Sequence, residues 1–303
     1  MKKGSEITVI ANPQSGWGRG RRFARILIGR LREKGYRVRA LWTGGRGHAE
    51  ALAREEAAGG NGMLLVCGGD GTLHETIQAL AGTETMLAPA PAGRCNDFCR
   101  ALGLASRVEE VLRLLERGQP SRVDLARVDG RHFCTVGALG FDAAVSRFVD
   151  EMTLPLRGTP AYLYAALTML ARYQCPEVEL TWDGGHYQGP FFMCAVGNTP
   201  TYGNNIPVTP GADPRDGRFR VCLVRPVTLR RVLTLIPKLL KGGHAGAPEV
   251  DMFDCSRLVI TTDRPVELWA DGEPVAETPL EISVAPGALK VLTPPAPEAP
   301  QGD

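Results

Sequence analysis

An aspartate lies between glycines directly after one of the most apolar runs in the chain. The run Met63–Cys67 is followed by Gly68-Gly69-Asp70-Gly71-Thr72. Glycines allow the backbone to approach a ligand closely, and a carboxylate at the end of a buried strand is well placed to bind a metal or to catalyse. The spacing of Thr72 and Glu75 is that of a capping box, which predicts that a helix begins here.

Two further glycine-bearing loops follow apolar runs, Asn12–Gly20 and Pro91–Phe98. The backbone N–H groups of a glycine-rich turn that opens a helix suit a phosphate group. The first loop has neither P-loop nor dinucleotide-binding spacing, so a plain tight turn is the alternative. In chain order the first loop is Asn12–Gly20, the second Gly68–Thr72 and the third Pro91–Phe98. In the third loop Asn96 and Asp97 are also typical helix caps, and Arg94 adds a cation.

The elements that must position these loops alternate between strand and helix patterns. Apolar runs predict strands at 7–11, 36–42, 63–67 and 86–91, and helical spacing predicts helices between them, including 49–58 and 73–80. This alternation is typical of a mainly parallel sheet flanked by helices. Ligands on such sheets bind at the carboxyl ends of the strands, where all three loops begin.

The pattern changes after about residue 122. Short strand-like runs separated by Asp-Gly turns predict an antiparallel β-sandwich or open barrel. Two helical stretches interrupt these runs, at 162–173 and 228–241; the second is basic and amphipathic, typical of a membrane-surface helix or of a helix packed on a core. We therefore expect an α/β domain at 1–122, a β domain at 123–292 and a Pro-rich tail at 293–303.

Composition narrows the function classes. The 303 residues carry a formal net charge of +2, with 36 glycines and eight cysteines. So balanced a charge argues against a nucleic-acid binder, and no apolar run is long enough to span a membrane. The cysteines are scattered without metal-ligand spacing, which favours reduced thiols in a cytoplasmic protein.

Several motifs occur in a fixed order: Asn12-Pro13-x-Ser15-Gly16, Gly68-Gly69-Asp70-Gly71-Thr72 with Glu75, Pro91-x-Gly93 with Asn96-Asp97-Phe98, Gly140-Phe141-Asp142-Ala143, Pro210-x-Ala212 with Asp216-Gly217, and Asp271-Gly272-Glu273. Together they resemble the diacylglycerol kinase catalytic-domain family, which includes bacterial soluble lipid kinases and sphingosine and ceramide kinases. The Gly-Gly-Asp-Gly-Thr motif is shared with NAD kinases and phosphofructokinases. The Asn-Asp-Phe and Asp-Gly-Glu motifs favour the lipid kinases.

The resemblance implies a fold and an activity. The fold would be an N-terminal three-layer α/β nucleotide-binding domain plus a C-terminal antiparallel β-sandwich domain, with the active site between them. The activity would be transfer of phosphate from ATP, with Mg²⁺, to a lipid hydroxyl, with diacylglycerol as the first choice and phosphatidic acid as its product. Such an enzyme would be cytoplasmic and would associate peripherally with the membrane that holds its lipid. The oligomeric state stays open, a homodimer included.

The resemblance also implies roles for individual residues. Nucleotide contacts would come from Asn12, Pro13, Gln14, Ser15, Gly16, Thr43, Gly69, Asp70, Gly71, Thr72, Glu75, Arg94, Asn96 and Asp97. The magnesium site would use Asp216, helped by Asp213, Arg218 and Asp124. Asp70, Asp97 and Asp124 would form the acidic network around metal and phosphates. The catalytic residues would be Glu273, Asp70 and Asp271.

Three alternatives stay open at this point. Arg94 stands where the family usually has threonine, so its role toward phosphate is a hypothesis. The general base is Glu273 or Asp70, and we favour Glu273, although Asp271-Gly272 is also a typical hairpin turn. The alternative functions are a soluble-substrate kinase of the NAD-kinase type, a sphingoid or ceramide kinase, and a non-catalytic nucleotide- or lipid-binding module.

Overall fold

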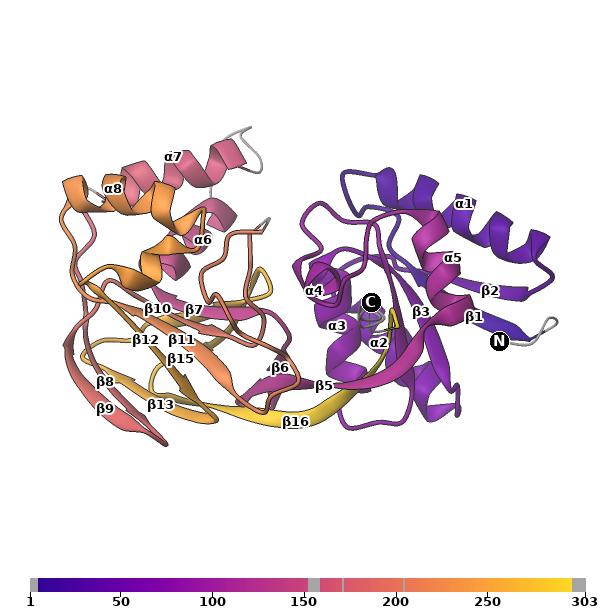
Figure 1. Cartoon of the computed structure of the whole chain (residues 1–303). Coiled ribbons are helices and arrows are strands. Elements are labelled where there is room, and N and C mark those ends of the chain that lie inside the picture. Colours follow the sequence, from indigo (N-terminus) through magenta and orange to yellow (C-terminus); the bar gives the residue numbers. More distant parts are fainter. Residues whose placement is uncertain (1–4, 152–158, 171, 204, 296–303) are drawn as a thin grey trace, which may run out of the picture. The chain divides into compact units, whose positions relative to one another are not determined.

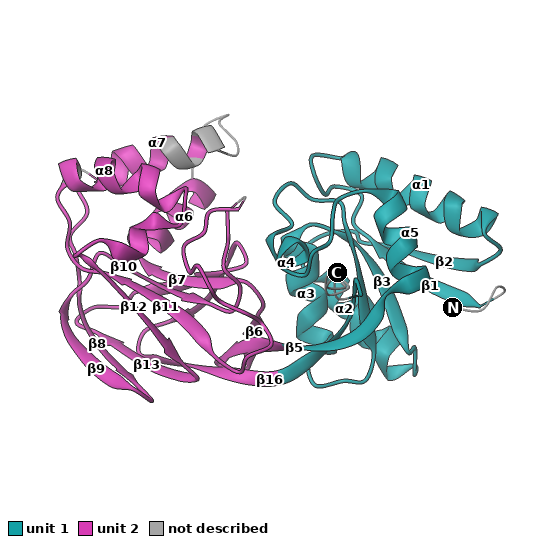
Figure 2. Cartoon of the chain, viewed as in Figure 1, with its two compact units in different colours: residues 1–123, 287–303 teal, residues 124–286 magenta. Residues whose placement is uncertain are grey.

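The computed structural model describes residues 5–151, 159–170, 172–203 and 205–295 (Figure 1). Contacts divide the chain into two compact units, residues 1–123 with 287–303 and residues 124–286 (Figure 2). The chain passes between the units within two strands, β5 (Gln119–Val128) and β16 (Leu280–Thr293). Residues from 287 onward thus belong with unit 1, whereas the sequence analysis placed 287–292 in the second domain. Of the predicted tail, residues 296–303 lie outside the described residues.

Unit 1 alternates strands and helices. Its sheet has the order β2-β1-β3-β4 with parallel pairs, and the end of β16 adds to β4 in parallel where Val291 pairs with Leu87. The elements are β1 (Glu6–Ala11), α1 (Arg19–Glu33), β2 (Arg37–Trp42), α2 (His48–Ala58), β3 (Met63–Gly68), α3 (Asp70–Leu80), β4 (Met86–Pro91), α4 (Asp97–Ala101) and α5 (Val108–Arg117).

Helices cover both faces of this sheet, α1 and α5 on one side and α2 and α3 on the other (Figure 1). A strand buried on both faces needs apolar side chains in consecutive positions, and Leu64, Leu65 and Val66 of β3 are all fully buried. The predicted three-layer α/β arrangement is confirmed.

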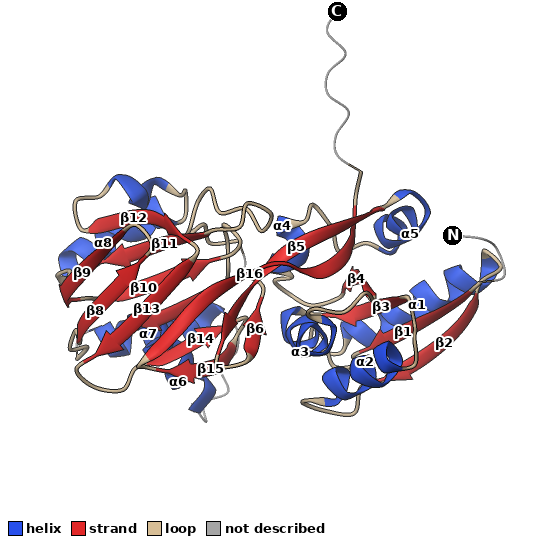
Figure 3. Ribbon diagram, turned by 90° about the horizontal axis from the view of Figure 1, so that it is seen from below, coloured by secondary structure: helices blue, strands red, loops and turns tan. Residues whose placement is uncertain are grey.

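Unit 2 is built from two antiparallel sheets. One joins β16, β13, β8 and β9, with β5 on β16 and β6 on β5; the other has the order β12-β11-β10-β7-β14-β15 (Figure 3). Its strands beyond β5 and β16 are β6 (Arg131–Phe133), β7 (Val136–Gly140), β8 (Glu177–Trp182), β9 (Gly185–Pro190), β10 (Met193–Gly197), β11 (Phe219–Val224), β12 (Val250–Cys255), β13 (Arg257–Thr262), β14 (Glu267–Ala270) and β15 (Glu273–Glu277).

The core of unit 2 lies between these sheets. Fully buried side chains from both, such as Leu180 and Leu258 of one and Leu139 and Phe219 of the other, form one cluster. The predicted antiparallel β-sandwich is therefore confirmed. The sequence analysis did not predict β9, β12 or β15. Of these, β9 carries almost no apolar signal.

Three helices cover the outer face of the second sheet, α6 (Phe141–Glu151), α7 (Thr159–Leu170) and α8 (Leu229–Leu239), followed by the short helix η1 (Gly243–Gly246) (Figure 1). A second apolar cluster lies beneath them, where Leu235 of α8 and Leu170 of α7 pack near Phe192. The two predicted helical insertions correspond to α7 and α8, whereas α6 was not predicted.

Candidate active site

The three glycine-bearing loops meet at the carboxyl edge of the unit 1 sheet, because β1, β3 and β4 are parallel neighbours there. Gly69 donates its backbone N–H to Ser15 Oγ at 3.1 Å, which ties the second loop to the first. Asn12 Nδ2 donates to Thr72 Oγ1 at 2.9 Å across the same two loops. The sequence-predicted residues of unit 1 are thus held together by direct hydrogen bonds.

The glycines of these loops are required by close backbone approach. A Cβ on Gly93 would lie 2.5 Å from Gly69 Cα, and a Cβ on Gly16 would lie 2.8 Å from the Ala92 carbonyl oxygen. Contacts shorter than 3 Å between a Cβ and backbone atoms force the backbone to shift, so a side chain at these positions would move one loop away from its neighbour. Gly71 differs, because nothing lies within 4 Å of its Cβ position and its φ is not positive.

Helix α3 starts with N–H groups that no side chain caps. In α1 the first N–H groups are bonded to loop carbonyls, Arg19 to Gly16 at 3.4 Å and Gly20 to Ser15 at 2.8 Å. The N-cap residues of α1 and α3 are Gly18 and Gly69, which have no side chain to accept from the first turn. The start of α3, with its positive dipole end, therefore favours an anion such as a phosphate. The open space beside Gly71 lies at the start of α3, so a ligand can approach that helix end.

The predicted capping box is wrong. Helix α3 begins at Asp70, one turn earlier than Thr72 requires, and Thr72 is buried in that first turn. The Glu75 carboxylate accepts from the backbone N–H groups of Gly47 at 2.7 Å and Ala49 at 3.0 Å, and therefore caps α2. Glu75 is a predicted nucleotide residue that the structure places against a neighbouring helix.

The remaining predicted residues of the first loop shape its turn. Asn12 Oδ1 accepts the Gln14 N–H at 2.9 Å across Pro13, an Asx-type turn that fixes the loop as it leaves β1. Thr43 follows β2, is buried, and donates its N–H to the Ala11 carbonyl at 2.9 Å. These groups define the edge on which the glycine loops lie.

Trp17 is a site residue that the sequence analysis did not single out. Its indole is 64% exposed and lies under the Arg94 guanidinium, whose Cζ is 4.2 Å from the ring centroid. Its φ of +61° is in the left-handed region, which is strained for a residue with a large side chain. In the sequence, a bulky aromatic residue between Gly16 and Gly18 is the feature that could have pointed to Trp17. The pair brings the cation of the third loop to the first loop.

An acidic group lies at the third loop. Asp70, Cys95 and Asp97 each place one potential ligand atom within 4.8 Å of the others, the one such group within the described ranges. Burial raises the pKa of the Cys95 thiol, and the charges of Asp97 and Asp70 raise it further. The thiol thus stays protonated, and the carboxylate oxygens of the group come from Asp70 and Asp97.

The same residues brace the loop. Asp70 Oδ2 accepts the Asn96 N–H at 2.7 Å, and Asn96 exchanges two hydrogen bonds with the backbone of Gly93. Asp97 forms an ion pair with Arg100 at 3.0 Å. Asn96 holds a φ of +53°, a conformation that asparagine tolerates better than most residues.

The predicted metal residues belong to unit 2 and lie around one turn. Asp124 is buried, and its Oδ2 accepts the Gly217 N–H at 2.8 Å. Asp216 Oδ1 accepts the Arg218 N–H at 2.9 Å. Burial raises the pKa of the Asp216 carboxyl, and the charges of Asp213 and Asp124 raise it further. The charge of Asp254 acts in the same direction, so Asp216 lies within range of three other carboxylates.

A buried asparagine supports this turn, and sequence reasoning missed it. Asn198 is fully buried, and its Nδ2 donates to the Asp124 carbonyl at 2.9 Å and to the Cys134 carbonyl at 3.0 Å. Asn198 follows strand β10, and nothing in the sequence distinguishes it from an ordinary loop residue. It joins the segment of Asp124 to the segment that holds Asp271.

Asp271 and Glu273 lie at the β14–β15 hairpin. Asp271 and Gly272 have φ of +54° and +87°, as a two-residue type I′ turn requires, so the hairpin interpretation of this motif is confirmed. The Asp271 carboxylate accepts from the N–H groups of Cys134 at 3.0 Å and Thr135 at 2.9 Å, and from the Thr135 hydroxyl. The Asp271 carboxylate therefore holds the backbone of the neighbouring segment. Glu273 is the half-buried first residue of β15.

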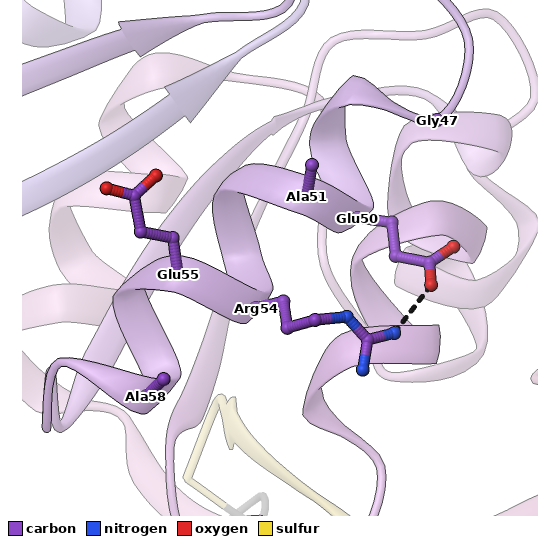
Figure 4. Close-up of a pocket in the computed structure, with 6 residues that line it drawn as sticks. All are labelled: Gly47, Glu50, Ala51, Arg54, Glu55 and Ala58. Atoms are coloured by element: carbon purple, nitrogen blue, oxygen red, sulfur yellow. Dashed lines mark hydrogen bonds and ion pairs between the residues drawn. The ribbon is translucent and has the colours of Figure 1, made fainter.

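A shallow depression of about 490 Å³ lies along the surface of α2 (Figure 4). None of the predicted site residues lines it, and its charged residues include Glu50 and Arg54, which pair with each other at 2.7 Å. It therefore adds no group to the candidate site.

Comparison with known proteins gives the family. Residues 6–128 match the profile of the diacylglycerol kinase catalytic domain, and residues 135–293 match the YegS C-terminal NAD kinase beta sandwich-like domain. A diacylglycerol kinase of Mycobacterium tuberculosis (strain ATCC 25618 / H37Rv) is 30% identical over 95% of both chains. A "Probable lipid kinase YegS-like" protein of Pseudomonas savastanoi pv. phaseolicola is 31% identical over 87% of this chain and 86% of its own.

Solved structures share the fold. A diacylglycerol kinase structure from Bacillus anthracis str. Sterne has a TM-score of 0.77 and 25% identity, covering 98% of this chain and 99% of that one. A second structure from the same organism reaches a TM-score of 0.81 at 24% identity over 98% of this chain. Within the described ranges, no helix is both long and apolar enough to cross a bilayer.

The glycine contacts lead to a stability prediction. We expect Gly93→Ala to lower the free energy of unfolding by about 1–3 kcal/mol, because its Cβ meets the backbone of Gly69. Gly71→Ala places its Cβ in open space and should leave stability unchanged or raise it by up to about 1 kcal/mol. Gly29→Ala, on helix α1 with nothing within 4 Å, is the matched control and should be stabilising. Chemical denaturation of the three variants tests this, and equal losses for Gly93→Ala and Gly71→Ala would contradict the assignment.

Proposed function

Because the chain belongs to the family of diacylglycerol kinases and YegS-like lipid kinases, we propose that it transfers phosphate from ATP to the hydroxyl of diacylglycerol. A lipid kinase is what the family membership establishes, and ATP is the phosphate donor that such a kinase uses. The choice of diacylglycerol rests on the Mycobacterium tuberculosis relative that is named a diacylglycerol kinase. It matches this chain over 95% of both sequences. Sphingoid bases and ceramide are the alternative lipids.

Unit 1 supplies groups suited to the triphosphate. Transfer of a phosphoryl group depends mainly on positioning and on stabilisation of negative charge. The start of α3, which no side chain caps, provides backbone N–H groups, and the open space beside Gly71 allows phosphates to reach them. Arg94, held over Trp17, adds a cation at the same loops.

The carboxylates of unit 2 have the chemistry that a magnesium ion prefers, although their oxygens are not gathered within 4.8 Å of one another as the ligand atoms of Asp70, Cys95 and Asp97 are. Mg²⁺ prefers oxygen ligands, and Asp124, Asp213 and Asp216 offer oxygen ligands only. The charges of Asp213 and Asp124 raise the pKa of the Asp216 carboxyl, and a bound cation would relieve that repulsion. We assign the metal to Asp216, with support from Asp213, Asp124 and the segment of Arg218. When bound, the ion would neutralise charge on the phosphates.

Glu273 is the proposed general base. Its carboxylate would accept the proton of the lipid hydroxyl as the oxygen attacks the γ-phosphate of ATP, and ADP would leave. Asp271 holds the hairpin that presents Glu273, through its bonds to Cys134 and Thr135. We also propose that the protein is cytoplasmic and acts at the membrane surface, since its lipid substrate lies there.

The substrate is tested with a panel. Purified protein with labelled ATP and mixed micelles should transfer phosphate to diacylglycerol, and the product should migrate as phosphatidic acid. Sphingosine, ceramide and NAD are the comparison acceptors, and omission of Mg²⁺ should abolish transfer. Preferential transfer to ceramide or sphingosine would reassign the lipid. Transfer to NAD alone, or to no acceptor despite ATP binding, would refute the proposal.

Arg94 and Trp17 should act on the nucleotide together. We expect Arg94→Ala to raise the KM for ATP about tenfold, because the variant loses the binding free energy of one charge-assisted hydrogen bond. Trp17→Ala should raise it two- to fivefold, because an exposed cation–π pair is worth about 0.5–1 kcal/mol. In the Arg94→Ala background Trp17→Ala should add little, and Trp17→Phe should retain part of the effect. Steady-state kinetics at saturating lipid measure this; additive effects would mean that the pair does not act as a unit.

Glu273 and Asp271 should give contrasting losses. Glu273→Gln should lower kcat by about 10²–10⁴-fold, as removal of a general base does, and should cost less stability than Asp271→Asn. Asp271→Asn should also destabilise the protein by about 1–3 kcal/mol, because an amide nitrogen would face N–H donors. Rates and unfolding curves of both variants separate the two roles. An unchanged rate in Glu273→Gln would exclude it as the base.

A further inference from the structure

Exposed apolar side chains gather on two helices of unit 2. Over the described part of the chain, eight large apolar side chains are exposed, and five of them lie on α7 and α8. They are Tyr164, Leu167, Leu233, Ile236 and Leu240, of which the last follows directly after α8. Both helices lie on the same side of the second sheet (Figures 1 and 3).

Helix α8 is apolar on two of its faces. Val232, Leu235 and Leu239 pack against the apolar cluster beneath the helix. Leu233, Ile236 and Leu240 lie at helical spacing on the outer face and are 53%, 41% and 59% exposed. Leu233, Ile236 and Leu240 thus lie outside the apolar cluster that attaches the helix to the sheet.

Positive charges flank the outer stripe. Arg230, Lys238 and Lys241 are all exposed, and the segment 229–241 contains no acidic residue. Arg231 differs, because it forms an ion pair with Glu249 at 2.8 Å. Helix α7 carries no charged side chain at all. The outward surface of α8 is therefore apolar and cationic, without a compensating acid on the helix.

We propose that the outer face of α8 docks on an anionic lipid surface, with the apolar stripe inserted between headgroups and the three cations at their level. This deepens the proposed function, on which it rests, by naming where the enzyme meets its lipid. A basic amphipathic helix lies in a membrane interface through such a combination of apolar burial and charge attraction. A second copy of the chain fits less well, because a two-fold contact through this face would bring like charges together.

Vesicle sedimentation tests the docking face without catalysis. Wild-type protein should bind vesicles of phosphatidylcholine with about 30 mol% phosphatidylglycerol, and bind phosphatidylcholine alone more weakly. Leu233→Ser with Ile236→Ser and Leu240→Ser should weaken binding at least tenfold. Arg230→Gln, Lys238→Gln and Lys241→Gln should each weaken binding about fivefold, and only to the anionic vesicles. Ile26→Ser, which changes a 45% exposed side chain on α1, is the matched control and should bind as wild type does.

The outcomes separate this inference from the substrate assignment. With a short-chain diacylglycerol that dissolves as monomers, the triple serine variant should retain wild-type kcat and lose activity only on vesicles. Vesicle binding unaffected by all α8 changes would overturn the inference while leaving the kinase assignment intact. A wild-type dimer that the triple variant dissociates would instead assign the face to a second copy. Binding that depends on α8 together with failure of every lipid acceptor would refute the proposed reaction and keep the docking face.

Discussion

The contact between the backbones of Gly69 and Gly93 is the constraint on which the unit 1 site depends. A Cβ at Gly93 would lie 2.5 Å from Gly69 Cα, so the loops after β3 and β4 meet only because neither has a side chain there. The contact brings Asn96 close enough to give its N–H to Asp70 at 2.7 Å. It thereby fixes the start of α3 relative to the start of α4, and with it the positions of the helix N–H groups that suit phosphate.

Hydrogen bonds extend this constraint to the other loop and to a further helix. Ser15 accepts from Gly69, and Asn12 donates to Thr72, so the first loop follows the position of the second. Glu75, one turn further along α3, caps α2 through two backbone N–H groups. The starts of α2 and α4 and the loop before α1 are thus all hydrogen-bonded to α3 or to the loop before it. Under this arrangement a change at one loop alters the geometry of all of them.

Periodicity predicted most of the fold, because it reports burial directly. The strands of unit 1 and helices α7 and α8 follow apolar patterns that the sequence displays. Strand β9 could not be found this way, since Gly185–Pro190 pairs by its backbone with β8 and buries little. At the site, the motif residues were identifiable, but their partners were not. The role of Glu75 depends on α2, which lies elsewhere in the sequence. Trp17 is noticeable as a bulky residue between two glycines, but its place depends on a left-handed backbone angle that periodicity does not report.

The same geometry bears on the choice of base. A carboxylate whose oxygens accept backbone N–H groups has fewer lone pairs for a substrate proton and is needed to hold its loop. Asp70 braces Asn96, and Asp271 receives two N–H groups and a hydroxyl. Replacing either would move backbone as well as charge. Glu273 is the first residue of β15 and directly follows the turn that Asp271 fixes. The pairing of β14 with β15 therefore determines where Glu273 lies. Of the acidic motif residues considered as base, Asp70 and Asp271 are therefore the two whose carboxylates hold a loop backbone in place.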